Sequence, residues 1–287
     1  MTSFWTLFKQ LFKQKNKSAN LVFLIQLAAA IVTMIMAFIG TINTSSFKFQ
    51  IGPDISLNLF SGVIVGIIAT FLGYSFLANP AYIIITSWKN EKVNRSQTWR
   101  LVPMNDGLIY VCNTLSSFAS FVYLIVLQAI MAVLAAIITY ASSDQVRSAV
   151  AMVLNKMGMI SSQPLIWEFL GDSLLMVLLA SLLGLFWYVI VSFLHFTSCA
   201  IIDFLPNGSN KFLVFVVRLI VLIAVVYILT VLGNLLGNIG LDSIFGNNND
   251  FAVSMIPAFI DIIILDLIFG IVNFLLINKF VEAKQSR

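Results

Sequence analysis

Six long apolar stretches make up most of this chain, and they constrain its fold more than any other feature. They lie at 21–40, 59–79, 118–140, 174–196, 212–236 and 256–278. About 20 apolar residues in a helix cross the roughly 30 Å hydrocarbon core of a bilayer. The polar segments between them are too short for a water-soluble domain of ordinary size. The sequence therefore predicts an all-α, polytopic membrane protein with six transmembrane helices.

The composition and the charge distribution agree with a membrane domain. Hydrophobic residues make up 60% of the chain and charged residues 10%, whereas soluble domains are about 25% charged. The net charge of +4 comes from residues scattered at the ends of apolar stretches. Because these residues do not form one basic surface, nucleic acid is not predicted as a partner. The lipid bilayer is the predicted partner.

Two segments outside the crossings are predicted to be amphipathic helices. In residues 1–18, an aromatic and leucine face with lysine and glutamine beside it predicts a helix lying on the inner leaflet; that face contains Phe4, Trp5, Phe8, Leu11 and Phe12. It would either anchor the first crossing or take part in gating. Residues 19–287 then form the six-helix domain. Within the outer loop 141–171, a second helix is expected at about 145–160, either on the membrane surface or capping the extracellular mouth.

The distribution of lysine and arginine predicts the orientation. Alternate loops and the two ends contain 13 of the 16 basic residues, so the positive-inside rule places both termini in the cytoplasm. The bias toward Phe, Ile, Lys and Asn points to a bacterial plasma membrane. Cys112 and Cys199 are expected at cytoplasmic helix ends, where thiols stay reduced.

Motifs for chemistry are missing from the sequence. It contains no phosphate-binding loop, no G-x-G-x-x-G and no H-E-x-x-H pattern. We therefore expect neither ATP hydrolysis nor other catalysis by this chain, and no cofactor or metal bound to it. His195, the single histidine, has no evident Asp, Glu or Cys partner and is predicted to be a packing residue.

Two carboxylates in the sixth crossing are candidates for a pathway, because a charge in hydrocarbon is costly unless it faces protein or water. Asp261 lies one turn past Pro257, where a helix N-terminus would tolerate it, so a structural role is equally open. Asp266 lies near mid-membrane. An internal cavity, a hydrogen bond between helices and a protonated form are all possible for it.

The most distinctive segment is the loop 87–107 between the second and third crossings. It is polar, carries both signs of charge and contains Glu91, Lys92, Thr98, Leu101, Val102 and Pro103, with Met104, Asn105 and Asp106 opening the next helix. With the six crossings and the N-terminal amphipathic helix, this pattern resembles the permease subunits of ABC transporters of the type 2, exporter-like class.

The resemblance implies that residues 89–103 are a coupling helix that inserts into a groove of a separate ATPase subunit. The implied coupling positions are Glu91, Lys92, Arg95, Thr98, Arg100 and Pro103. It also implies a second permease chain, identical or related, with ATP and Mg²⁺ bound by the partner ATPase. An ordinary solvated cytoplasmic loop is the simpler alternative.

Other functions remain open. The chain could be an ATP-independent membrane protein, either a proton-coupled secondary carrier using Asp266 and Asp261 or an immunity or scaffold protein. Because the crossings contain few charges, an amphiphilic or hydrophobic transported molecule is expected.

Overall fold

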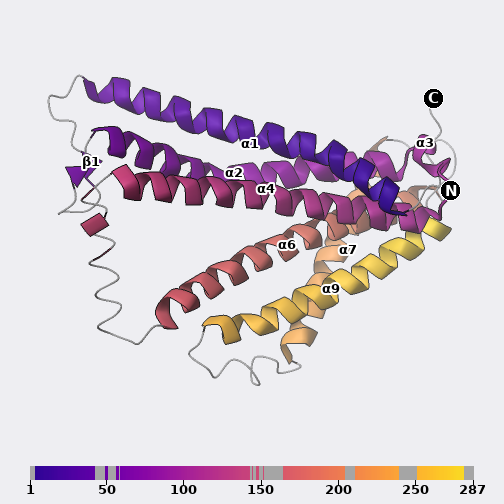
Figure 1. The fold of residues 1–287 in the computed structure, drawn as a ribbon. Coiled ribbons are helices and arrows are strands. Elements are labelled where there is room, and N and C mark those ends of the chain that lie inside the picture. The colour runs from indigo at the N-terminus through magenta and orange to yellow at the C-terminus, as the bar shows by residue number, and fades with distance from the viewer. Residues whose placement is uncertain are drawn as a thin grey trace. The chain divides into compact units, whose positions relative to one another are not determined.

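The computed structural model describes residues 4–42, 49–50, 56–57, 59–142, 164–203, 211–238 and 251–280, with positions 144, 147, 148 and 151. Nearly all of this is helix (Figure 1). The helices are α1 (Phe4–Ile42), α2 (Leu59–Asn94), α3 (Gln97–Arg100), α4 (Asp106–Ser142), α6 (Pro164–Asp203), α7 (Lys211–Asn238) and α9 (Phe251–Lys279). Two short strands, β1 (Phe49–Gln50) and β2 (Ser56–Leu57), pair antiparallel between α1 and α2.

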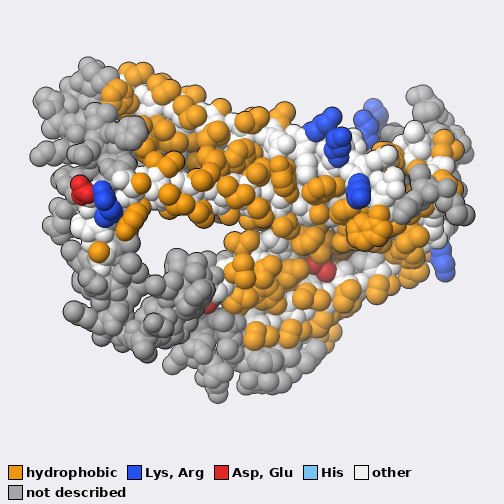
Figure 2. Space-filling view, in the orientation of Figure 1, with side chains coloured by type: hydrophobic (Ala, Val, Ile, Leu, Met, Phe, Trp, Pro, Cys, Tyr) orange, Lys and Arg blue, Asp and Glu red, His pale blue; other side chains and the backbone are white. Residues whose placement is uncertain are grey.

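Six of these helices are long and apolar enough to cross a membrane: α1, α2, α4, α6, α7 and α9. Large apolar side chains cover their outward faces (Figure 2), as expected for surfaces in contact with lipid. Examples are Leu24, Phe76 and Leu222, all more than 45% exposed. The predicted fold class, an all-α polytopic membrane protein, is confirmed.

The helices extend beyond the predicted crossings. Helix α2 was expected to end its crossing at Asn79, but it continues through Pro80 to Asn94. With 36 residues it is about 54 Å long at 1.5 Å per residue, well beyond the roughly 30 Å of hydrocarbon. Its last turns contain Lys89, Glu91 and Lys92, so this polar end is the part that projects from the hydrocarbon.

The N-terminal segment is helical, as predicted, and is continuous with the first crossing. Helix α1 runs without interruption from Phe4 to Ile42. Leu7 and Leu11 are buried and pack against Ile109 and Cys112 of α4. Leu7 and Leu11 of this segment therefore contact protein, whereas Trp5 of the predicted apolar face is 65% exposed.

The chain divides into two compact units. The first contains Met1–Lys15, Ile83–Ala119 and Gly171–Arg287; the second contains Asn16–Tyr82 and Ser120–Leu170. In the second unit, α1, α2 and α4 run side by side (Figure 1). The first unit contains the ends of these three helices together with α3, α6, α7 and α9.

Buried amides join the three helices of the second unit. Gln26 Nε2 of α1 donates to Phe71 O and Ser75 Oγ of α2, both at 2.8 Å. Gln128 Nε2 of α4 donates to Gln26 Oε1 at 2.8 Å and to Asn79 Oδ1 at 3.0 Å. Side-chain hydrogen bonds between membrane helices stabilise their packing.

Most of the outer helix predicted at about 145–160 lies outside the described residues. At its start, Arg147 forms an ion pair with Asp144 at 2.5 Å.

Candidate functional site

The segment between α2 and α4, residues 95–105, is a folded connection. After α2 ends, Ser96 takes an extended conformation and precedes the single turn of α3. Asn105 caps α4, because the Gly107 N–H donates to Asn105 Oδ1 at 2.8 Å. The predicted loop 87–107 is thus the end of α2, the short α3 and a capped start of α4.

The inner face of this connection is apolar and packed. Val93 at the end of α2, with Trp99, Val102 and Met104 of the connection, packs against a buried cluster. That cluster consists of Leu7, Leu11, Ile109 and Cys112. The connection is therefore fixed to α1 and α4 within the first unit.

The outer face of the connection is exposed. Leu101 is 82% exposed, and Lys92, Thr98 and Pro103 are also exposed. Arg100 lies in α3. Lys92, Thr98 and Pro103 are three of the implied coupling residues, and with Leu101 they form a surface that combines one large apolar side chain with polar groups.

Glu91 and Arg95 face inward instead. The Glu91 side chain is only 13% exposed and lies against α6: Ser192 Oγ donates to Glu91 Oε1 at 2.7 Å. Arg95 is partly buried, and its Nε has no hydrogen-bond partner among the described residues.

The expectation that His195 lacks acidic and cysteine neighbours is wrong. Its Nε2 lies 3.6 Å from Glu91 Oε2 and 3.8 Å from Cys199 Sγ. Sequence could not reveal the first contact because Glu91 is on another helix. A catalytic Cys-His-acid relay uses both ring nitrogens of the histidine, whereas here both groups approach the same nitrogen. Cys199 and Cys112 are buried and free.

A buried lysine near the connection was not predicted. Lys15 is 4% exposed. Its Nζ donates to Asn113 O at 2.5 Å, Asn113 Oδ1 at 2.6 Å, Ser116 Oγ at 2.8 Å and Ser117 Oγ at 2.5 Å. All four acceptors are uncharged oxygens of α4, so polar groups of the protein surround Lys15 Nζ.

Helix α2 contributes a second layer around this lysine. Asn113 Nδ2 donates to Asn90 O at 3.1 Å and to Asn94 Oδ1 at 2.8 Å. Ser117 Oγ donates to Asn90 Oδ1 at 2.7 Å. We define this set, Lys15, Asn90, Asn94, Asn113, Ser116 and Ser117, as the lysine cluster. It binds α1, α2 and α4 together directly behind the connection.

The start of α4 also contacts α9. The Gly107 N–H donates to Asn278 Oδ1 at 2.9 Å. Asn273 Nδ2 donates to Tyr110 OH at 2.9 Å and to the Val189 carbonyl of α6 at 2.8 Å. Helices α4, α6 and α9 are therefore joined by hydrogen bonds within the first unit.

We expect Gly107→Ala to be destabilising, because an added methyl group would lie 2.5 Å from Phe274 Cδ2 and 2.7 Å from Asn278 Nδ2. Overpacking of this kind costs about 1–3 kcal/mol. Gly73→Ala is the matched control, since nothing lies within 4 Å of a methyl group there. Thermal unfolding of the purified variants in detergent measures both; equal midpoints would contradict this packing.

Asp261 of α9 is placed differently from the prediction. Helix α9 begins at Phe251, so Pro257 lies inside it. Asp261 is therefore in the third turn, and the helix N-terminus does not account for it. Both carboxylate oxygens of Asp266, and Oδ1 of Asp261, are buried without a hydrogen-bond partner among the described residues.

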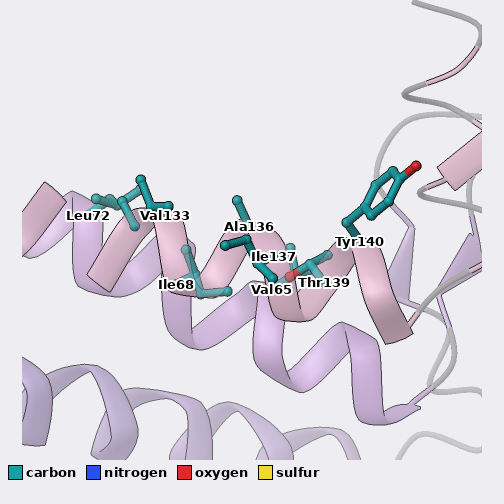
Figure 3. Close-up of a pocket in the computed structure, with 9 residues that line it drawn as sticks. Val65, Ile68, Leu72, Val133, Ala136, Ile137, Thr139 and Tyr140 are labelled. Carbon is teal, nitrogen blue, oxygen red and sulfur yellow. The ribbon is translucent and has the colours of Figure 1, made fainter. Parts of the chain in front are cut away.

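An open apolar groove lies between α2 and α4 in the second unit (Figure 3). Its volume is about 630 Å³, and it is lined by Val65, Ile68, Leu72, Ala132, Val133, Ala136, Ile137, Thr139 and Tyr140. Because it lies on membrane-crossing helices, its surface suits apolar groups of lipids or other amphiphiles.

No family model, curated protein or solved structure matches the chain. The assignment of a function therefore depends on the connection, on the buried groups behind it and on the carboxylates of α9.

Proposed function

We propose that this chain is the membrane-spanning permease subunit of an ATP-driven exporter. Two such chains, identical or related, form the pathway, and a separate ATPase subunit binds ATP and Mg²⁺. The connection between α2 and α4 carries this proposal. Its inner face is packed against Leu7 and Leu11, while its outer face exposes Leu101, Thr98 and Pro103.

These two faces suit a docking element that transmits force. A segment that moved independently of the helices would absorb the movement of a bound partner. The connection, in contrast, is packed on α1 and α4 and is continuous with α2 and α4. A partner that closes on ATP would displace these helix ends as a rigid body. Such a partner biases the transport equilibrium through its different contacts in two states.

The charge distribution supports a cytoplasmic location for this surface. Lys89, Lys92, Arg95 and Arg100 lie at or beside the connection, and positively charged loops stay on the cytoplasmic side. ATP is available there. We place the protein in a bacterial plasma membrane with both termini in the cytoplasm.

An amphiphilic or hydrophobic molecule is the transported species in this proposal. The groove of Figure 3 offers an almost entirely apolar surface, and the crossings contain few charges. A small ion would need polar ligands along its path.

Co-purification tests the proposal. The tagged chain is extracted from its native membrane in mild detergent, and proteins bound to it are identified by mass spectrometry. We expect a stoichiometric subunit with a phosphate-binding loop. Recovery of the chain alone in several gentle detergents would contradict the proposal.

Asp266 supports a second candidate, a proton-coupled secondary carrier. Neither of its oxygens has a hydrogen-bond partner within the described residues, and an acidic group inside a membrane helix is a functional candidate. In this case Asp266→Asn would abolish transport, whereas changes in the connection would have little effect.

We expect dicyclohexylcarbodiimide, an apolar reagent for neutral carboxyl groups, to modify Asp266. A carboxyl group buried without a partner is more stable uncharged, and the reagent reaches it through lipid. Mass spectrometry of the α9 peptide measures the adduct, with Asp266→Asn as the control. An unmodified peptide would show that Asp266 is ionised or shielded, and would weigh against the carrier.

A further inference from the structure

The last turns of α2 present two different surfaces. Lys92 is exposed on one side. The adjacent residue, Glu91, is directed into the first unit, where its side chain is 13% exposed. A residue in that position contacts its own chain, so Glu91 and Lys92 have different roles even though both belong to the same polar segment.

The contacts of Glu91 lead to α6. Glu91 Oε1 accepts a hydrogen bond of 2.7 Å from Ser192 Oγ, and Ser192 is 2% exposed. His195, one turn further along α6, lies 3.6 Å from Glu91 Oε2. A carboxylate enclosed in this way keeps its position relative to α6, because a displaced carboxylate would lose this hydrogen bond in surroundings with little water.

The contact continues from α6 to α9. Three residues before Ser192, the Val189 carbonyl accepts the hydrogen bond from Asn273. Asn273 and Asp266 are seven residues apart, and two helical turns place them on the same side of α9. The contacts therefore run from Glu91 of α2 to Ser192 of α6, and from Val189 of α6 to Asn273 of α9.

We propose that Glu91 is a positioning residue that transmits displacement of the connection to α6, and that it does not touch the ATPase. This inference rests on the proposed function. It replaces the implied role of Glu91 as a docking residue, and it predicts that docking and coupling separate at neighbouring positions. The hydrogen bond to Ser192 carries the effect, so a neutral acceptor at position 91 is sufficient.

The test compares five proteins: the unchanged chain, Glu91→Ala, Glu91→Gln, Ser192→Ala and the control Lys279→Ala, whose side chain is exposed at the end of α9. Each also contains Leu183→Cys, a 49% exposed position of α6, labelled with an environment-sensitive fluorescent maleimide. Labelling without Leu183→Cys gives the background from the two native cysteines. The readouts are the amount of ATPase that co-purifies and the change in emission on adding ATP with vanadate.

We expect the ATPase to co-purify with all five proteins. The emission change is lost in Glu91→Ala and Ser192→Ala, which remove the hydrogen bond from either side. It is retained in Glu91→Gln, whose carbonyl oxygen accepts from Ser192, and in the exposed control Lys279→Ala, which lies outside the connection. Ser192→Ala removes only a hydroxyl group, so it still tests the hydrogen bond in the event that Glu91→Ala does not fold.

Three results would overturn the inference. An unchanged emission response in both Glu91→Ala and Ser192→Ala would show that α6 moves without this hydrogen bond. Loss of the response in Glu91→Gln would show that the charge acts instead. Release of the ATPase by Glu91→Ala would return Glu91 to the docking surface. Absence of the ATPase from the unchanged protein would refute the proposed function itself.

Discussion

Replacing Asn113 by Leu is expected to lower the free energy of unfolding by about 2–5 kcal/mol, because each buried polar group left unpaired costs about 1–3 kcal/mol. The change removes one acceptor from Lys15 Nζ and the donor from both Asn90 O and Asn94 Oδ1. Asparagine and leucine have the same number and branching of heavy side-chain atoms. The expected loss of stability therefore comes mainly from the missing hydrogen bonds.

The matched control is Asn20→Leu. Asn20 is exposed and accepts one hydrogen bond, from Tyr123 OH at 3.1 Å, so the same substitution is expected to change stability by less than about 0.5 kcal/mol. Unfolding in mixed micelles of mild detergent and sodium dodecyl sulfate, followed by circular dichroism, gives both values.

A double variant makes this prediction more specific. Removing both partners of a buried polar contact is less harmful than removing one. We therefore expect Asn94→Leu combined with Asn113→Leu to be more stable than Asn113→Leu alone, because Asn94 Oδ1 is an acceptor that Asn113→Leu leaves unpaired. If the double variant is the less stable of the two, Asn94 and Asn113 are not paired as described.

Replacing Leu101 by Glu is expected to abolish co-purification of the ATPase. Burying a leucine in an interface contributes about 1.5–3 kcal/mol, and placing a carboxylate there adds a desolvation cost. Together these weaken binding by about 100-fold or more. The fold should not change, since Leu101 is 82% exposed.

Phe280→Glu is the control for this change. Phe280 is 48% exposed in the first unit and lies outside the connection, so it receives the same charge without touching the proposed docking surface. Affinity capture of each variant measures the ATPase recovered per chain. Equal recovery with Leu101→Glu and the unchanged protein would exclude Leu101 from the interface.

The number and type of the membrane helices followed from the sequence, but their ends did not. A run of about 20 apolar residues marks the part of a helix in hydrocarbon; it does not mark the polar turns that continue into water. Helix α2 continues for 15 residues past Asn79, and α4 begins 12 residues before Phe118. Neighbouring helices cover these polar ends, and this information is not local to the sequence.

The candidate site was only partly accessible from sequence. The outward residues of the connection could be recognised because Thr98, Leu101 and Pro103 are close together in the chain. The side to which Glu91 points depends on α6, which lies about 100 residues away. Asp261 was misjudged because α9 begins before Pro257.

The sequence contains a pattern that indicates the burial of Lys15. Leu7, Leu11, Lys15 and Ala19 recur every four residues and are all buried, which places the lysine on the apolar side of α1. The buried pair Gln26 and Gln128 shows the limit of such patterns: each amide looks isolated in its own apolar stretch, and only helix packing joins them.

Photocrosslinking from position 101 tests the docking of an ATPase most directly. A benzoylphenylalanine replaces Leu101 in one protein and Phe76 in another; both side chains are 82% exposed, but Phe76 lies in the apolar part of α2. After illumination in native membranes, we predict an ATPase adduct from position 101 and none from position 76. No adduct from position 101, or equal adducts from both, would contradict the proposed role of the connection.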